Sequence, residues 1–157
     1  MSDQEPPADA AGGSPKRRPK QRPAESQGAE EAESRSSRKL VFVADDDEDL
    51  LKLYGRVVKK AGCRVALAKD GVGAARLLKK ARPDLILLDN KMPRMDGFEL
   101  LELLNRYKAA SKIPVVFLTD RDDPLELDRA LRLGVADYLV KPVSPKQLFQ
   151  KVRAILK

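Results

Sequence analysis

Five side chains that could handle a phosphoryl group stand directly after apolar runs between Leu40 and Lys141. Four runs of strand length lead into Asp45, Asp46, Asp89, Thr119 and Lys141. Such runs, separated by segments with helical periodicity, are typical of parallel strands buried on both faces. Ligands of an open parallel α/β sheet bind at the carboxyl ends of the strands. The sequence therefore predicts that three carboxylates, a hydroxyl and an ammonium converge on one site.

The acidic residues predict a magnesium site. Asp45, Asp46 and Asp89 come together if the first and third strands are neighbours, and clustered carboxylates repel one another unless a cation lies among them. A site made only of oxygen ligands suits Mg²⁺, which takes one or two carboxylates together with phosphate oxygens and keeps several waters. The acidic residues 47–49 have a simpler explanation, because acidic side chains cap and stabilise the N-terminus of a helix.

Asp89 is the candidate nucleophile. It ends an apolar strand and is followed by the Pro- and Gly-containing segment 90–97. A carboxylate in this position can accept a phosphoryl group and form an acyl phosphate. Thr119 and Lys141, at the ends of the next two strands, would supply a hydroxyl donor and a compact cation for the added oxygens.

The elements that position these residues alternate from Leu40 to the last residue. We expect strands at 40–44, 64–68, 85–89, 114–119 and 137–140, and helices at 48–61, 71–81, 97–108, 124–133 and 145–156. Residues 123–126 and 144–147 each combine an N-cap, a proline at the first helical position and a capping-box partner. Gly62 and Gly134 stand where C-cap glycines are expected. The pattern implies an α/β fold, a doubly wound (βα)5 flavodoxin-like three-layer sandwich whose parallel sheet has the order 2-1-3-4-5.

Residues 1–38 differ in composition from the rest of the chain. They contain no aromatic residue and no Leu, Ile or Val, so they cannot bury enough apolar surface to offset the entropy of ordering. We expect a disordered tail at 1–38, rich in Pro, Ser, Lys, Arg and Glu, and one folded domain at 39–157 that leaves no room for a second. The basic cluster 16–22 could contact an acidic partner or nucleic acid, although a solubilising role is the simpler interpretation.

Composition excludes several classes of function. The 157 residues include no histidine, which rules out histidine acid–base chemistry and metal ligation, and the single Cys63 cannot form an internal disulfide. No apolar run has the length of a membrane span, so we expect a cytoplasmic protein. The net charge of +7 lies in 39–157, because residues 1–38 hold seven basic and seven acidic side chains. The basic residues are dispersed over helix faces and last turns, and no recognition helix appears, so nucleic acid is not an expected partner.

Together these motifs resemble the response-regulator receiver domain of bacterial two-component systems, in particular single-domain chemotaxis regulators. The resemblance covers about residues 39–157. It implies that Asp89 accepts the phosphoryl group and that Asp45 and Asp46 hold Mg²⁺, with Asp46 as the direct ligand. The backbone carbonyl of Lys91 would complete the metal shell.

The resemblance assigns further roles along the chain. The Met-Pro and Asp-Gly pairs within 92–97 match the loop that follows the phosphorylation site. Thr119 would be the switch hydroxyl and Tyr138 the aromatic residue that rotates, although Tyr138 has an ordinary interpretation as a strand aromatic packed on a helix. Lys141 would bind the phosphoryl group, and its bond to Pro142 is typically cis in this family.

Two residues depart from the family pattern or stand where it varies. Receiver domains usually carry a small residue after the switch threonine, whereas this chain has Asp120, whose carboxylate could repel a phosphoryl group or reshape the following loop. Lys91 stands two residues after the acceptor, where side chains tune hydrolysis. A cation there could screen the phosphoryl group or block the attacking water.

The resemblance implies a phosphorylation-dependent response regulator, which is a signalling protein rather than an enzyme, apart from slow autodephosphorylation. A sensor histidine kinase or a phosphotransfer protein would donate the phosphoryl group, because the chain has no histidine of its own. Without an effector domain, the signal would pass by protein binding through the face formed by 124–133, 137–140 and 145–156. The downstream target, the pathway and a phosphorylation-dependent homodimer stay open.

Two other functions are compatible with parts of the pattern. A magnesium-dependent phosphohydrolase would use the same aspartyl phosphate, but it would need a general acid where Lys91 stands. A degenerate receiver that serves only as a scaffold is favoured by Asp120 alone. The complete set of candidate site residues opposes the scaffold.

Overall fold

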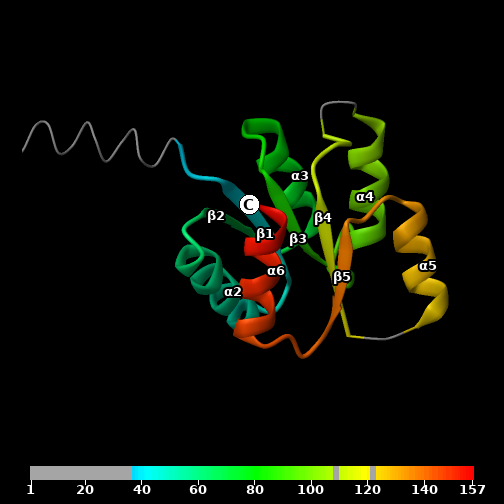
Figure 1. The fold of residues 1–157 in the computed structure, drawn as a ribbon. Coiled ribbons are helices and arrows are strands. Elements are labelled where there is room, and N and C mark those ends of the chain that lie inside the picture. Colours follow the sequence, from blue (N-terminus) through cyan, green and yellow to red (C-terminus); the bar gives the residue numbers. More distant parts are fainter. Residues whose placement is uncertain (1–36, 108–109, 121–122) are drawn as a thin grey trace, which may run out of the picture. The chain divides into compact units, whose positions relative to one another are not determined.

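Strands and helices alternate along the described part of the chain (Figure 1). The computed structural model describes residues 37–107, 110–120 and 123–157. The strands are β1 (Leu40–Ala44), β2 (Arg64–Ala68), β3 (Leu85–Asp89), β4 (Val115–Thr119) and β5 (Asp137–Val140). The helices are α2 (Glu48–Lys60), α3 (Gly71–Lys80), α4 (Gly97–Arg106), α5 (Pro124–Arg132) and α6 (Pro145–Ile155). All ten predicted elements are present, with boundaries that differ by no more than two residues.

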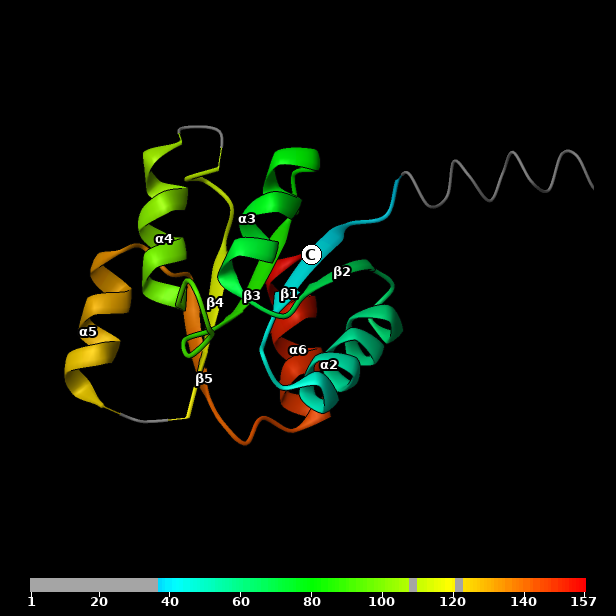
Figure 2. The same cartoon turned by 180° about the vertical axis from the view of Figure 1, so that it is seen from behind.

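The five strands form one parallel sheet in the order β2-β1-β3-β4-β5. Helices α2 and α6 cover one face and α3, α4 and α5 cover the other (Figures 1 and 2). The predicted doubly wound three-layer architecture is therefore confirmed. Lys39–Lys157 form one compact unit. Of the predicted tail at 1–38, only Ser37 and Arg38 lie among the described residues, so the expected disorder concerns a segment outside them.

Alternation along the central strands divides the core into two layers. In β1, Val41 and Val43 pack with the α2 and α6 side, whereas Phe42 and Ala44 pack with the α3, α4 and α5 side. Strand β3 behaves in the same way and is buried along its whole length. Since successive side chains of a strand point to opposite faces, a continuous apolar run is required to fill both layers. None of the described helices is both long enough and apolar enough to pass through a bilayer.

The predicted helix ends are largely confirmed. Ser144 and Gln147 form the reciprocal capping box at the start of α6, and Gly62 and Gly134 have the positive φ angles of C-cap glycines. The box expected for α5 is wrong: Asp123 caps the helix, but its side chain accepts a hydrogen bond from the amide of Leu125 and not from that of Glu126. The short Asp side chain reaches the amide two residues ahead in an Asx turn.

Two glycines let the loop after β3 lie close against its neighbours. A Cβ atom on Gly71, the first residue of α3, would stand 2.2 Å from the carbonyl oxygen of Met95. A Cβ atom on Gly97 would stand 2.8 Å from the carbonyl oxygen of Asp89 and 2.9 Å from the Phe117 ring. The loop between β3 and α4 is therefore held at its two ends by contacts that only a glycine permits.

We predict that Gly71→Ala destabilises the fold by about 1–3 kcal/mol, the usual cost of forcing an extra methyl group into a packed site. The matched control is Gly55→Ala in the interior of α2, where the new Cβ would meet the Leu67 side chain at an ordinary 3.5 Å. That substitution should be neutral or stabilising, because alanine favours a helix over glycine. Urea unfolding of both variants measures the difference, and equal stabilities would contradict the close approach at Met95.

Candidate phosphoacceptor and metal site

Asp45 and Asp89 lie side by side because β1 and β3 are neighbouring strands. Ala44 pairs with Leu88 in the sheet, so the next residue of each strand reaches the same edge. Both aspartates are buried, whereas Asp46, one residue further along, is exposed. One carboxylate oxygen from each of the three lies within 4.8 Å of the others. The structure therefore brings the three predicted carboxylates together.

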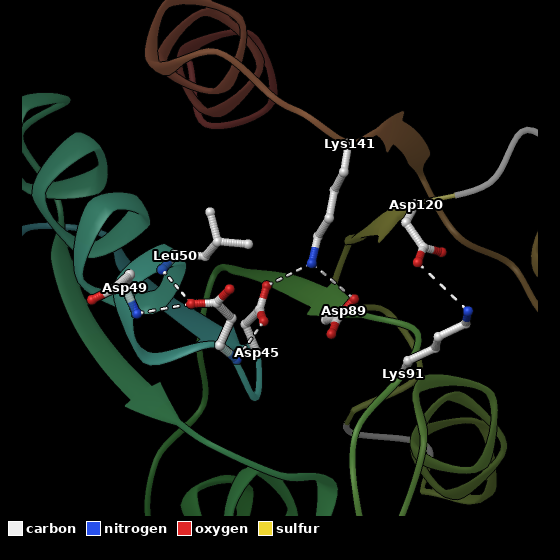
Figure 3. A network of polar contacts seen from close by, with 8 residues as sticks. Asp45, Asp49, Leu50, Asp89, Lys91, Asp120 and Lys141 are labelled. Atoms are coloured by element: carbon white, nitrogen blue, oxygen red, sulfur yellow. Dashed lines mark hydrogen bonds and ion pairs between the residues drawn. The ribbon is translucent and has the colours of Figure 1, made fainter.

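Lys141 connects two of these carboxylates (Figure 3). Its Nζ atom donates to Asp45 Oδ2 at 2.9 Å and to Asp89 Oδ1 at 3.1 Å. The lysine follows β5, and its backbone amide donates to the carbonyl of Thr119 at the end of β4. The side chain therefore extends past β4 to reach the acceptor, and little of it is exposed. The Lys141–Pro142 peptide bond is cis, as the resemblance implied.

The site carries more negative charge than Lys141 neutralises. The pKa of Asp89 is raised from 3.8 to about 6, chiefly by burial and next by the charge of Asp45, and Lys141 only partly opposes these effects. Burial alone would lower the pKa of Lys141, but its contacts with Asp45 and Asp89 outweigh burial and raise it. One ammonium group thus forms ion pairs with two buried carboxylates, and a third carboxylate, that of Asp46, lies close by.

The donor set fits a small divalent cation. Both oxygens of Asp45 already accept hydrogen bonds. Oδ1 accepts one from the backbone amide of Asp47 at 2.9 Å, and Oδ2 accepts one from the ammonium group of Lys141. Among the described residues, no hydrogen bond is found to Asp89 Oδ2 or to the Asp46 carboxylate. These oxygens suit Mg²⁺, which takes few protein oxygens and keeps several waters. Asp46 and Asp89 are thus the better direct ligands, and Asp45 is better placed to orient Lys141.

The two predicted switch residues lie at neighbouring strands. Thr119 ends β4, is buried at 3% exposure and lies beside β3, where Leu118 pairs with Asp89. Tyr138 in β5 pairs with Phe117 and is half-buried against the core on the α3, α4 and α5 side. The hydroxyl of Thr119 therefore lies one strand away from the acceptor, as predicted, and Tyr138 lies one strand further.

Lys91 and Asp120 form an ion pair that sequence reasoning missed. Lys91 Nζ lies 3.5 Å from Asp120 Oδ2, and each side chain is 54% exposed (Figure 3). The sequence indicates a cation at Lys91 and an anion at Asp120 near the phosphoryl group, but it does not indicate that the two side chains pair. Their proximity depends on the β3–β4 pairing and on how the two loops leave the sheet. The only signal in the sequence was that both residues follow neighbouring strand ends.

A second missed pair holds the loop after the acceptor. Arg94, whose φ of 69° is in the left-handed region, forms an ion pair with Asp70. Asp70 is buried and caps α3 by accepting the amide of Gly73. These contacts lower the pKa of Asp70, the amide of Gly73 contributing most and Arg94 next. The Asp-Gly sequence at 70–71 could have predicted the cap, but nothing local identified Arg94 as its partner.

A pocket of about 760 Å³ opens beside the site. The side toward the acceptor is formed by Asp46 and the loop after β3, and the opposite side by α4 and α5, where the Arg129 guanidinium stacks 4.2 Å from the centre of the Phe98 ring. The pocket therefore adjoins the candidate site through Asp46 and the loop after β3.

Comparison with known proteins identifies the family. The model of the response regulator receiver domain matches residues 41–153, which is more than half of the chain. The chain belongs to the response regulator receiver family. Among solved structures, this receiver is similar to the chemotaxis response regulator CheY4 of Vibrio cholerae, with a TM-score of 0.72 and 28% identity over 76% of this chain and 99% of that chain. The phosphorylated cyanobacterial phytochrome response regulator RcpA matches with a TM-score of 0.67 and 29% identity, covering 76% of this chain and 91% of that chain.

Curated relatives of this receiver are longer proteins. The DNA-binding response regulator MtrA of Mycolicibacterium paratuberculosis is 36% identical over 120 residues, which is 76% of this chain and 52% of the relative. The alkaline phosphatase synthesis transcriptional regulatory protein PhoP of Bacillus subtilis is 34% identical over 119 residues, 76% of this chain and 49% of the relative. The chain therefore spans about half the length of these relatives, and the shared part is the receiver domain.

We predict that Asp89→Asn stabilises the metal-free protein near neutral pH. Folding raises the Asp89 pKa from 3.8 to about 6, so ionisation of this carboxyl group is less favourable in the folded state than in the unfolded state. The folded protein therefore loses stability as the pH rises from 3.8 through about 6, and it keeps this stability below 3.8. An uncharged asparagine avoids that loss. The variant should therefore be more stable by about 1–3 kcal/mol at pH 7.5, two pKa units corresponding to about 3 kcal/mol.

Urea unfolding in EDTA at pH 7.5 and pH 4 checks this expectation. The stability advantage should largely disappear at pH 4, where the carboxyl group of the folded wild type is protonated and that of the unfolded chain is close to its pKa of 3.8. Asp49→Asn is the matched control, because Asp49 is exposed. An advantage of Asp89→Asn that does not change with pH would contradict the electrostatic explanation.

Proposed function

We propose that Asp89 accepts a phosphoryl group from a phosphohistidine of a sensor kinase or a phosphotransfer protein, and that the phosphorylated chain signals by binding another protein. The observation that carries the proposal is the contact of Lys141 with both Asp45 and Asp89 at the edge of the sheet. Membership of the receiver family supports the same assignment.

The chemistry follows from the position of each group. An oxygen of ionised Asp89 attacks the phosphorus in line, a P–O bond forms, the P–N bond breaks, and the histidine nitrogen keeps the electron pair. Lys141 offers its ammonium to the transferred oxygens, as charge-assisted hydrogen bonds to phosphate are strong. Mg²⁺ held by Asp46 and Asp89, with Asp45 and the Lys91 carbonyl in support, would offset the charge that develops on these oxygens.

Phosphorylation would change the conformational equilibrium through charge. A phosphoryl group adds about −1 to −2 charges next to Thr119, whose hydroxyl would donate to it. Movement of Thr119 would leave space for Tyr138, which is half-buried on the next strand. Changing a two-state protein from mostly inactive to mostly active takes about 5 kcal/mol of differential binding, which a charge-assisted contact from Thr119 and the Lys141 contact can supply in large part.

We propose the surface of α5, β5 and α6 as the output face. Three of the large hydrophobic side chains that are exposed in the described residues lie on α5 and β5: Leu125 at 81%, Leu131 at 54% and Val140 at 39%. Exposed apolar surface favours protein–protein contact, and these side chains lie on two of the three elements of the proposed face. A protein target, or a second copy of the chain, is therefore the partner that we propose for this face.

We predict that acetyl phosphate labels the wild-type protein and that Asp89→Asn abolishes labelling. The variant should remain folded, because the change keeps the shape of the side chain and removes a charge from an acidic site. Intact-mass measurement detects the added phosphoryl group, and circular dichroism checks the fold. Labelling of the variant at the wild-type level would show that the acceptor is another residue, and rapid multiple turnover would favour a phosphohydrolase.

We predict that labelling requires Mg²⁺ and that Asp46→Asn weakens Mg²⁺ binding by at least about tenfold, since even groups that only support a metal ligand usually contribute this much. The rise in melting temperature with added MgCl₂ measures the affinity. Asp49→Asn is the control, because it makes the same chemical change outside the cluster. An unchanged titration in Asp46→Asn would remove Asp46 from the metal site.

A further inference from the structure

The Lys91–Asp120 ion pair connects two segments that leave neighbouring strands beside the acceptor. Lys91 is the second residue after Asp89, and Asp120 directly follows Thr119. The strands are paired up to this level, since Asp89 pairs with Leu118 and the amide of Asn90 donates to the Leu118 carbonyl at 3.2 Å. The pair therefore joins the acceptor loop to the end of β4.

In the view of Figure 3, Asp89 has the ammonium group of Lys141 on one side and that of Lys91 on the other. On one side, Lys141 is mostly buried and contacts Asp89 directly. On the other side, Lys91 is half-exposed and is paired with Asp120. Lys91 also lines the pocket of about 760 Å³ beside the loop that follows Asp89. The second ammonium thus stands at the border between the acceptor and water.

A phosphoryl group on Asp89 would compete with Asp120 for this ammonium. An exposed ion pair contributes little to stability, so little is lost when it opens. A phosphoryl group carries about −1.5 to −2 charges at neutral pH and three acceptor oxygens, whereas Asp120 offers one charge. Lys91 is only two residues from Asp89 and has a long, flexible side chain, so the more highly charged anion should hold its ammonium group.

We infer that Lys91 exchanges partners on phosphorylation, leaving Asp120 for the phosphoryl oxygens, and that Asp120 thereby sets the lifetime of the phosphorylated state. This inference rests on the proposed function. Lys91 in its new position occupies the approach of the attacking water. Asp120 shortens the lifetime by drawing Lys91 back. When Lys91 leaves, Asp120, which directly follows the switch threonine, loses its partner.

The step whose rate is measured is hydrolysis of the acyl phosphate. A water oxygen forms a bond to phosphorus, the P–O bond to Asp89 breaks, and the Asp89 carboxylate leaves with the electron pair. The water loses one proton to solvent, and inorganic phosphate is released. Lys91 takes no proton in this step and acts as a positioning residue.

The experiment measures decay of protein labelled with acetyl phosphate, after removal of the donor and at fixed Mg²⁺, for wild type, Asp120→Asn, Lys91→Gln and the double variant. Asp120→Asn should lengthen the half-life by about two- to fivefold, the range that corresponds to a surface ion pair. Lys91→Gln should shorten it. The double variant should decay at the rate of Lys91→Gln alone, because Asp120 acts only through Lys91.

Direct repulsion between Asp120 and the phosphoryl group makes the opposite prediction for the double variant. In that case Asp120→Asn would lengthen the half-life at least as much when Lys91 is absent, since nothing would then screen the two anions. Equal or larger lengthening in the Lys91→Gln background would overturn the inference. Half-lives that are the same in all four proteins would overturn it as well.

A matched control and a separate check on the proposed function complete the design. Asp128→Asn removes an exposed ion pair with Arg132 on α5, and it should leave the half-life unchanged. If the wild type cannot be labelled at all, the proposed function fails and the partner exchange fails with it. If the wild type is labelled at Asp89 but the two substitutions act independently, only the partner exchange fails.

Discussion

The contact of the Lys141 ammonium with Asp45 and Asp89 is the interaction on which the site depends. It joins residues that are 96 and 52 positions apart in the chain, and it lies where β1 and β3 reach the same edge of the sheet. Buried carboxylates are costly without a partner, and here one cation serves two of them. The raised pKa of Asp89 shows that the compensation is incomplete. This remaining negative charge makes the site suited to a divalent cation.

The loop that follows the acceptor is fixed by contacts of a different kind. Backbone atoms of Met95 approach the first residue of α3 closely, and Arg94 reaches the buried cap of the same helix. Both contacts join the loop to the segment between β2 and α3, and neither involves the carboxylate cluster. The strand that ends at Asp89 is thus held by the sheet and its loop by α3, whereas the Asp120 side chain, just after β4, takes part in an exposed ion pair.

The contacts of Lys141 and the Lys91–Asp120 pair differ in strength, and this difference suits the proposed switch. Lys141 contacts its partners from a mostly buried position, so it keeps the site assembled whether or not a phosphoryl group is present. The Lys91–Asp120 pair is exposed and weak, so it can be broken at little cost. Thr119 lies immediately before Asp120, and the exposed hydrophobic side chains of α5 and β5 follow along the chain. Charge added at Asp89 would therefore lie close to an ion pair that can open at little cost.

The sequence by itself determined the fold and which residues meet at the candidate site. Apolar runs that fill both core layers identify buried parallel strands, and the polar residues that end Leu85–Asp89 and Val115–Thr119 must meet at one edge of the sheet. Only the tertiary structure decided which charged groups pair. Lys91 with Asp120, Arg94 with Asp70, and the failed capping box at Glu126 depend on side-chain reach and on the paths of loops. A local pattern cannot encode such contacts, because each partner lies on a different element that is positioned by the whole core.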